Sequence, residues 1–293
     1  MITVRLIGGL GNQMFQYAAG RSLALKHACA LQLDTADFVG YSLHQGFELA
    51  SVFGIDCKQA DRETRDSLLG WLRHGLVRRL LRRWPVLQIG DRVLVNEPHF
   101  QYWPGWQSLG SSAYLSGYWQ SERYFNEFAD QIRQDFQFAK PLDPLSVKIA
   151  KDMRAGVSVS LHVRRGDYAS NPKTTAVHGL CEPQYYAEAI QVLQKRHGSM
   201  HLFIFSDDIE WARANLPLGE HPNTFVSHNK GADSWRDMQL MTLCKHHVIA
   251  NSSFSWWGAW LNSSKSKSVI APKRWFANGT NVSDLFPKGW VTL

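Results

Sequence analysis

The fold is decided by the stretch VSVSLHVRRGDY, residues 157–168. Its odd positions from Val157 to Val163 are all apolar, which predicts a buried strand. The charged run RRGD, residues 164–167, follows where that strand is expected to end. In open parallel sheets, ligands bind outside the carboxyl ends of the strands. The stretch therefore predicts a parallel strand that leads into a polar, ligand-binding loop.

Expected strands and helices alternate on both sides of this stretch. Before it we expect strands at 2–7, 30–33 and 114–118, a loop at 8–12 and a helix at 13–27. After it we expect helices at 182–196 and 234–246, a helix opening at Ser252 and Ser253, and strands at 201–205, 224–227, 248–250 and 269–271. Such alternation is typical of parallel sheets with right-handed crossovers. With PLDP (141–144) as linker, the sequence predicts an α/β fold of two Rossmann-like domains, residues 1–144 and 145–293.

Composition limits the class of protein. The chain has 293 residues, 44% of them hydrophobic and 19% charged, which excludes a disordered or fibrous protein. The net charge of +7 favours an anionic ligand, a nucleic acid or a membrane surface. Nucleic-acid binding is disfavoured, because the positive charge is not spread over a base-stacking surface. The four cysteines lie far apart without a CxxC pair, which argues against disulfides and structural zinc and favours a reducing compartment.

Residues 64–84 predict a strongly basic helix. Its apolar residues recur every four positions from Leu68 to Trp84, and arginines crowd the rest. This pattern predicts binding to an anionic membrane surface. The alternative is a helix that packs its leucine face on a domain core. The opening MITVRLIGG has no features of a secretion signal, so we expect a cytoplasmic protein, peripheral on the inner membrane where this helix binds.

The adjacent Arg164 and Arg165 are the strongest candidates for an anion site. A guanidinium holds phosphate through two hydrogen bonds and stays charged at any relevant pH. We expect one arginine to contact the ligand and the other to pair with a carboxylate that fixes the loop. The alternative is an ordinary surface pair.

Further polar residues follow other expected strands. Ser252 and Ser253 open a helix whose free N–H groups suit a phosphate, although ordinary capping of that helix is the alternative. Asp207 and Asp208 either contact the ligand or only cap the helix that follows them. Trp256, Trp257 and Trp260 have the spacing of core residues rather than of a sugar platform. The chain has no DxD triplet, so we expect arginine and backbone amides, not a metal, to meet the anion.

Two other functions remain open at this point. Gly9 and Gly11 nearly match the GxGxxG motif, with Asp34 further on, which would suit a nicotinamide-dependent oxidoreductase. Met14 stands where the third glycine should serve close helix–strand packing, so the match is poor. The 12 tryptophans would suit a noncatalytic carbohydrate-binding protein.

Four motifs together resemble a known family. GGLGNQMFQYAAGRSLA (8–24), HVRRGDY (162–168), FSDDIEWAR (205–213) and ANSSFSWWGAWL (250–261) are similar to the bacterial α-1,2-fucosyltransferases of glycosyltransferase family 11. The resemblance implies a GT-B-type fold, GDP-fucose as donor, inversion at the anomeric carbon, and neither cofactor nor metal. It also implies a galactose-containing glycan as acceptor, fucosylated at the 2-hydroxyl of a β-galactoside in an oligosaccharide or polysaccharide repeat.

The resemblance also assigns roles to residues of this sequence. It implies that Arg164 holds the donor diphosphate with His162 nearby, that Asp237 reads guanine, and that Asn12 faces the reaction centre. Asp167 is the candidate for the catalytic base, or else a buried partner of an arginine. The remaining donor contacts are expected in the loops after the strands: Gly9, Gly11, Arg165, Asp208, Asn251, Ser252, Ser253, Phe254 and Ser255.

Overall fold

The computed structural model describes the chain except for residues 41–43, 61–69, 71–85, 90–91, 167–174 and 178. It forms two compact units. Unit 1 holds residues 1–139 and 281–287, and unit 2 holds residues 140–280 and 288–293.

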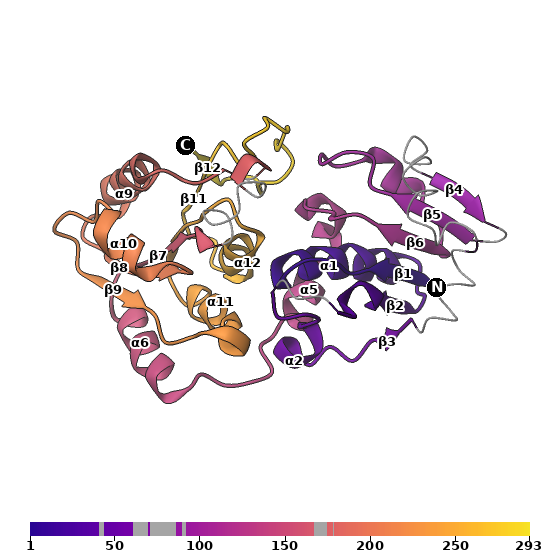
Figure 1. The fold of residues 1–293 in the computed structure, drawn as a ribbon, viewed down its shortest axis with the longest axis horizontal. Coiled ribbons are helices and arrows are strands. Elements are labelled where there is room, and N and C mark those ends of the chain that lie inside the picture. The colour runs from indigo at the N-terminus through magenta and orange to yellow at the C-terminus, as the bar shows by residue number, and fades with distance from the viewer. Residues whose placement is uncertain (41–43, 61–69, 71–85, 90–91, 167–174, 178) are drawn as a thin grey trace. The chain divides into compact units, whose positions relative to one another are not determined.

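Unit 1 is an α/β unit with one sheet (Figure 1). Its described strands and α-helices are β1 (Ile2–Arg5), α1 (Leu10–Lys26), β2 (Leu31–Asp34), α2 (Leu49–Phe53), β3 (Lys58–Gln59), β4 (Val86–Ile89), β5 (Arg92–Asn96), β6 (Ala113–Ser116) and α5 (Ala129–Asp135). Short 3₁₀ helices are η1 (Ala36–Phe38), η4 (Pro104–Ser108), η5 (Glu122–Tyr124) and η6 (Asn126–Phe128).

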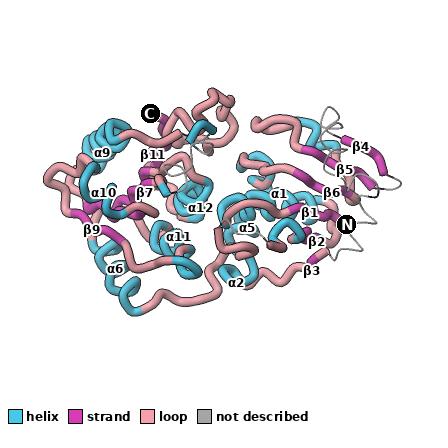
Figure 2. Tube along the Cα trace, in the orientation of Figure 1, coloured by secondary structure: helices cyan, strands magenta, loops and turns pink. Residues whose placement is uncertain are grey.

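Unit 2 repeats the alternation of strands and helices (Figure 2). Its described elements are α6 (Pro144–Ala155), β7 (Ser158–Val163), α9 (Pro183–His197), β8 (His201–Ser206), α10 (Ile209–Asn215), β9 (Asn223–Val226), η7 (Gly231–Asp233), α11 (Trp235–Met241), β10 (His246–Val248), α12 (Ser253–Leu261), β11 (Val269–Ala271) and β12 (Val291–Thr292).

Each sheet has a point at which the strand order reverses. Unit 1 has the order β3-β2-β1-β6-β5-β4, parallel except for the pair β4 and β5. Unit 2 has the order β12-β11-β10-β7-β8-β9 and every pair is parallel. The order therefore reverses between β1 and β6 in unit 1 and between β7 and β10 in unit 2. Ligands of doubly wound folds bind in the crevice at this point, and the predicted pair of Rossmann-like sheets is confirmed.

The core of unit 2 covers both faces of its sheet. Val159, Leu161 and Val163 of β7 pack with the apolar face of α9, as the alternation in the sequence predicts. On the other face, Phe203 and Phe205 pack with α6 and α11. Trp256, Trp257 and Trp260 are at most 3% exposed, and the rings of Trp256 and Trp257 meet edge to face at 5.0 Å. They are core residues, as predicted.

Unit 1 is completed by a late segment of the chain. The Asp284 carboxylate accepts from the backbone N–H of Tyr102 at 3.1 Å and pairs with Arg123 at 2.8 Å. The Ser121 hydroxyl donates to the Asp284 carbonyl at 2.6 Å. The sequence predicts one boundary, between residues 144 and 145. That boundary assigns residues 281–287 to the second domain, whereas in the structure they pack with unit 1. Local sequence patterns could not reveal it, because its partners lie more than a hundred residues away.

Some expected elements differ from the observed ones. The helix expected at 234–246 ends at Met241, because residues 246–248 pair with β7 and β11 as β10. The strand expected at 248–250 accordingly lies two residues earlier. The loop expected at 8–12 already contains the start of α1, since Leu10 is helical.

Two further expectations concern the membrane. The basic helix expected at 64–84 lies outside the described residues except for Gly70, so its binding to an anionic surface stays a prediction. Among the helices that the structure describes, none has both the length and the apolar character needed to cross a bilayer.

Gly20 allows α1 to pack closely on β1. A Cβ atom on Gly20 would lie 2.0 Å from Cγ2 of Val4, which is fully buried and, being β-branched, has few alternative rotamers. In the dinucleotide motif, the third glycine serves this close packing. Here Met14 stands at that position, and Gly20 serves the packing from later in the helix.

We predict that Gly20→Ala destabilises unit 1. Alanine is favoured over glycine in a helix by up to about 1 kcal/mol. The clash with Val4 should outweigh this gain and cost about 1–3 kcal/mol in the free energy of unfolding, measured in urea. Gly110→Ala is the control, because its added methyl group would meet open space. Equal stability of Gly20→Ala and the wild type would show that α1 can move away from β1.

Candidate functional site

The loop after β7 is fixed by Asp207, which follows β8. The Asp207 carboxylate pairs with Arg164 Nη1 at 2.9 Å and accepts from the backbone N–H of Arg165 at 2.8 Å. The side chains of Arg164 and Asp207 are about one quarter exposed, at 26% and 24%. One carboxylate therefore orients both the guanidinium and the backbone of the arginine pair at the edge of the sheet.

The two arginines have different surroundings. Arg164 makes the carboxylate pair that we expected for one of them, but it is also the arginine assigned to the diphosphate. The two roles are compatible, because a guanidinium has five N–H donors and its ion pair uses only part of them. Arg165 stacks on Trp211, with its guanidinium carbon 3.8 Å from the ring centroid. Gly166 permits the close approach of Asp207, since a Cβ there would lie 2.6 Å from Oδ2.

His162 is a neutral side chain beside this arginine. Burial, and then the positive charge of Arg164, lowers the pKa of His162 to about 3. Its Nδ1 atom is buried and has no hydrogen-bond partner among the described residues. The imidazole lies 5.9 Å from the Phe254 ring, measured between centroids. The structure thus brings together His162 near the end of β7, Arg164 just after it and Phe254 at the start of α12. His162 is a hydrogen-bonding group that carries no charge.

The residues around the start of α12 have structural roles. The Ser252 hydroxyl caps the helix by accepting from the backbone N–H of Phe254 at 3.3 Å. Ser255 is buried and donates to the Ser252 carbonyl at 3.3 Å. Asn251 is buried, and its amide donates to the carbonyls of Trp275 and Gly179 at 3.3 and 3.4 Å. Capping of α12 by Ser252 is thus observed. Ser253 is the first residue of α12, and the N–H groups of its first turn lie at the carboxyl edge of the sheet.

Asp208 and Asp237 lie on other helices of unit 2. Asp208 caps α10 by accepting from the backbone N–H of Trp211 at 3.1 Å, which is the capping role the sequence left open. Asp237 lies in the first turn of α11 and accepts from Asn229 Nδ2 at 2.8 Å. Burial raises the pKa of Asp237 to about 7, although the bond from Asn229 acts in the opposite direction.

The glycine-rich loop of unit 1 follows β1 at the point where the strand order reverses. Gly8 has φ of +79°, and Gly9 precedes the first residue of α1. A Cβ on Gly8 would lie 2.6 Å from Asn12 Nδ2. The Asn12 carboxamide oxygen accepts from Gln120 Nε2 at 2.7 Å, so the first turn of α1 is joined to the segment after β6. Gly11 lies within α1.

The N-terminus of α1 already has a carboxylate. The backbone N–H of Leu10 donates to Glu48, which is 7% exposed. Burial raises the pKa of Glu48 to about 7. A pyrophosphate at this helix end would have to displace that carboxylate, which disfavours the nicotinamide-dependent alternative.

Gln120 and Glu48 were not singled out by the sequence. Gln120 belongs to no motif, and only the pairing of β1 with β6 places it beside Asn12. Glu48 had one indirect signal: α1 begins after a glycine and has no acidic residue in its first turn, so its N–H groups need an outside partner. Asp167, the candidate base, lies outside the described residues. Within the described part of the chain, no three His, Cys, Asp or Glu side chains cluster as metal ligands would.

Comparison with known proteins gives consistent matches. The sequence model described as "Glycosyl transferase family 11" matches residues 106–293. The chain is 35% identical to an α-1,2-colitosyltransferase of Escherichia coli over 299 aligned positions, which cover 100% of this chain and 99% of the relative. It is 33% identical to the O-antigen biosynthesis glycosyltransferase WbnK of Escherichia coli, over 98% of this chain and 99% of the relative.

A solved structure shares the fold. The α-1,6-fucosyltransferase NodZ, in a crystal soaked with GDP-fucose, superposes with a TM-score of 0.54 and 12% sequence identity. The superposition covers 89% of this chain and 91% of NodZ. At this identity the likeness shows the fold alone, and it agrees with the predicted GT-B-type architecture.

We predict that Asp237 makes stability depend on pH. The pKa of Asp237 is about 7 in the folded chain, against about 3.9 for an ordinary aspartate. Between these values the folded state keeps a proton that the unfolded state has lost, so the contribution of Asp237 to stability falls as pH rises from about 4 to about 7. An asparagine side chain does not titrate, so Asp237→Asn should not show this fall in stability.

The measurement is the free energy of unfolding in urea across this range. The stability of Asp237→Asn relative to the wild type should rise up to pH about 7 and then stay level. Glu210→Gln, which removes an exposed acid on α10, is the control for the loss of one negative charge. A flat difference for Asp237→Asn would mean that the Asp237 carboxyl titrates normally.

Proposed function

The chain belongs to glycosyl transferase family 11, and from that premise we propose that it is an inverting galactoside α-1,2-fucosyltransferase. It transfers L-fucose from GDP-fucose to the 2-hydroxyl of a β-galactoside in an O-antigen-type glycan. The observation that carries this proposal is the similarity, over nearly the whole chain, to proteins named α-1,2-colitosyltransferase and O-antigen biosynthesis glycosyltransferase. Neither the oxidoreductase nor the noncatalytic binding protein gains support from these relatives.

Arg164 is proposed to stabilise the leaving diphosphate. As the bond between fucose and GDP stretches, the sugar becomes oxocarbenium-like and negative charge grows on the diphosphate. A guanidinium that is already oriented by Asp207 needs no reorganisation as that charge develops. Neutral His162 and the first N–H groups of α12, with Ser252 and Ser253, supply further hydrogen bonds. The remaining proposed donor contacts come from Gly9, Gly11, Arg165, Asp208, Asn251, Phe254 and Ser255.

Asp237 is proposed to bind the guanine base. An ionised carboxylate accepts from N1–H and N2–H of guanine together, which adenine does not offer. Asn229 holds the Asp237 carboxyl by a single bond at 2.8 Å, to Oδ1. Because the pKa of Asp237 is about 7, guanine binding should favour the ionised form and release a proton below that pH.

The acceptor hydroxyl must lose its proton to a base, for which Asp167 stays the candidate. Asn12 is proposed to face the reaction centre, with its carboxamide oriented by Gln120. The defining experiment offers GDP-fucose and a panel of β-galactosides to the protein and determines the linkage of every product. Transfer to the galactose 2-hydroxyl supports the proposal, whereas a different linkage or no transfer contradicts it.

A second donor is favoured by one relative, the α-1,2-colitosyltransferase. Colitose is fucose without the 3-hydroxyl group, so both GDP-sugars present the same nucleotide to Arg164 and Asp237. The ratio of kcat/KM for GDP-fucose and GDP-colitose decides between them. A site that hydrogen-bonds the 3-hydroxyl should reject colitose strongly, because its polar groups would be left without partners.

We predict that Arg164→Lys is nearly as harmful as Arg164→Ala. An ammonium group cannot reproduce the two-bond geometry of a guanidinium. Both variants should lose about 2–4 kcal/mol of transition-state stabilisation, measured as kcat/KM for GDP-fucose. Arg213→Lys is the control, since Arg213 stacks on Phe225 and has no proposed donor contact. Activity of Arg164→Lys within a few fold of the wild type would refute the two-bond contact.

We predict that Asp237→Asn weakens GDP binding and reduces discrimination against ADP. Each charge-assisted hydrogen bond lost is worth about 1.5–3 kcal/mol. Calorimetry should also show that GDP affinity of the wild type rises with pH up to about 7, whereas that of the variant does not change. Glu210→Gln should behave as the wild type. Unchanged GDP affinity in Asp237→Asn would remove this residue from the base site.

We predict that chelation of divalent metals leaves the rate unchanged. Arginine and helix N–H groups are proposed to bind the diphosphate, so no bridging cation is needed. The measurement is the transfer rate with EDTA and after addition of Mg²⁺ or Mn²⁺. A strict metal requirement would contradict this account of the diphosphate site.

A further inference from the structure

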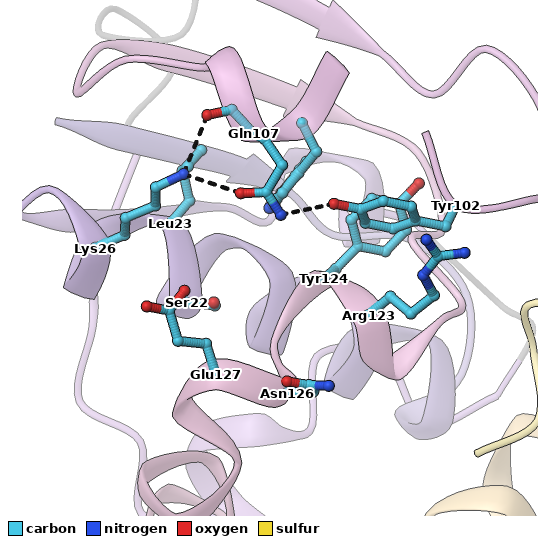
Figure 3. Close-up of a pocket in the computed structure, with 10 residues that line it drawn as sticks. Ser22, Leu23, Lys26, Tyr102, Gln107, Arg123, Tyr124, Asn126 and Glu127 are labelled. Carbon is cyan, nitrogen blue, oxygen red and sulfur yellow. Dashed lines mark hydrogen bonds between the residues drawn. The ribbon is translucent and has the colours of Figure 1, made fainter. Parts of the chain in front are cut away.

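Unit 1 contains a pocket of about 290 Å³ beside α1 (Figure 3). It is lined by Tyr102, which precedes η4, and by side chains of α1, η4, η5 and η6. None of the residues proposed above for fucosyl transfer lines this pocket.

One wall is a chain of hydrogen bonds. The Lys26 ammonium donates to the backbone and side-chain oxygens of Gln107 at 3.1 and 3.2 Å. The Gln107 amide in turn donates to the Tyr102 hydroxyl at 2.8 Å, and Figure 3 shows this chain crossing from Lys26 to Tyr102. The Tyr102 ring packs on Tyr124, with centroids 4.9 Å apart, and the guanidinium carbon of Arg123 lies over the Tyr102 ring, 4.2 Å from its centroid. This wall is therefore a fixed surface.

The opposite side of the pocket carries polar groups of both kinds. Asn126 and Glu127 are exposed, and Ser22 of α1 lies beside them in Figure 3. Together they offer hydroxyl and amide donors, and hydroxyl, amide and carboxylate acceptors. A ligand that both donates and accepts, such as a ring bearing several hydroxyl groups, matches this set.

Other classes of ligand match less well. Of the two cations, Arg123 is paired with Asp284 at 2.8 Å and Lys26 is held by Gln107, and Glu127 adds a negative charge. This balance disfavours a phosphate or another anion. The polar lining disfavours an apolar ligand. The hydrogen-bonding groups of the pocket would lose their bonds to water, and an apolar ligand could not replace those bonds.

The pocket lies far from the glycine-rich loop. Ser22 comes 12 residues after Leu10, the first residue of α1. At about 1.5 Å per residue, this separation is about 18 Å along the helix. A single sugar cannot reach from the loop to the pocket, but a glycan chain can.

We propose that this pocket binds a pyranose residue of the acceptor glycan, distant from the galactose that receives fucose. The proposal rests on the proposed function for the nature of the glycan, but binding itself requires no transfer. The pocket would give the enzyme a preference for long acceptors over single galactosides.

The test uses the double variant Asn126→Ala and Glu127→Ala. Both side chains are exposed, so their removal should leave the fold intact, and thermal unfolding checks this directly. Asp130→Ala is the matched control, because it also removes an exposed acid nearby but lies outside the pocket. The probes are methyl β-D-galactoside and a long galactose-terminated oligosaccharide.

The double variant should raise KM for the oligosaccharide by about two- to tenfold for each hydrogen bond lost, with kcat unchanged. KM for methyl galactoside should not change, and Asp130→Ala should match the wild type with both acceptors. Calorimetry without GDP-fucose should show the same loss of oligosaccharide binding.

Equal oligosaccharide affinity in the double variant and the wild type would overturn the proposal. An equal rise of KM for both acceptors would also overturn it, because the effect would then lie at the site of transfer. Failure of the wild type to fucosylate any galactoside would instead contradict the proposed function. In that case, calorimetry with the oligosaccharide still decides whether the pocket binds sugar.

Discussion

Parallel strands end at the same edge of a sheet, and this constraint determines where the chemistry of the chain can lie. Each unit places two neighbouring loops at the point where its strand order reverses. In unit 2 these segments hold Arg164 and the start of α12, and in unit 1 they hold Asn12, in the first turn of α1, and Gln120. The polar residues of each unit are separated widely in the sequence. The pairing of β7 with β10 brings those of unit 2 to one edge of its sheet, and the pairing of β1 with β6 does the same within unit 1.

Electrostatics distinguishes the candidate donor-site residues of unit 2. Arg164 keeps a fixed charge oriented by Asp207, whereas burial keeps His162 neutral and raises the pKa of Asp237 to about 7. Unit 2 thus supplies a permanent cation, a neutral hydrogen-bonding ring and an acid that can titrate near neutrality. This combination supports the proposed binding of an anionic leaving group and a guanine base.

The sequence predicted what depends on local pattern. The alternation from Val157 to Val163, the strand 269–271, the Ser252 cap and the tryptophan core could all be predicted, because each depends on neighbours within a few residues. The end of α11, the return of Asp284 and the contacts of Gln120 and Glu48 could not. Each of these depends on a partner brought close by the sheet or by a distant segment, and periodicity carries no information about such partners. The roles of the donor-site residues stay predictions, since they require a bound nucleotide.

The return of residues 281–287 has a consequence for how the protein is made. Unit 1 begins with the first strand of the chain, yet Tyr102, Ser121 and Arg123 find their Asp284 partner only after nearly all of unit 2 has been synthesised. On the ribosome, the first unit must therefore wait in an unfinished state while the second emerges. The same connectivity means that unit 1 expressed alone as a continuous N-terminal fragment would lack part of itself, and in a two-piece reconstitution only the second piece, residues 140–293, can supply the missing segment.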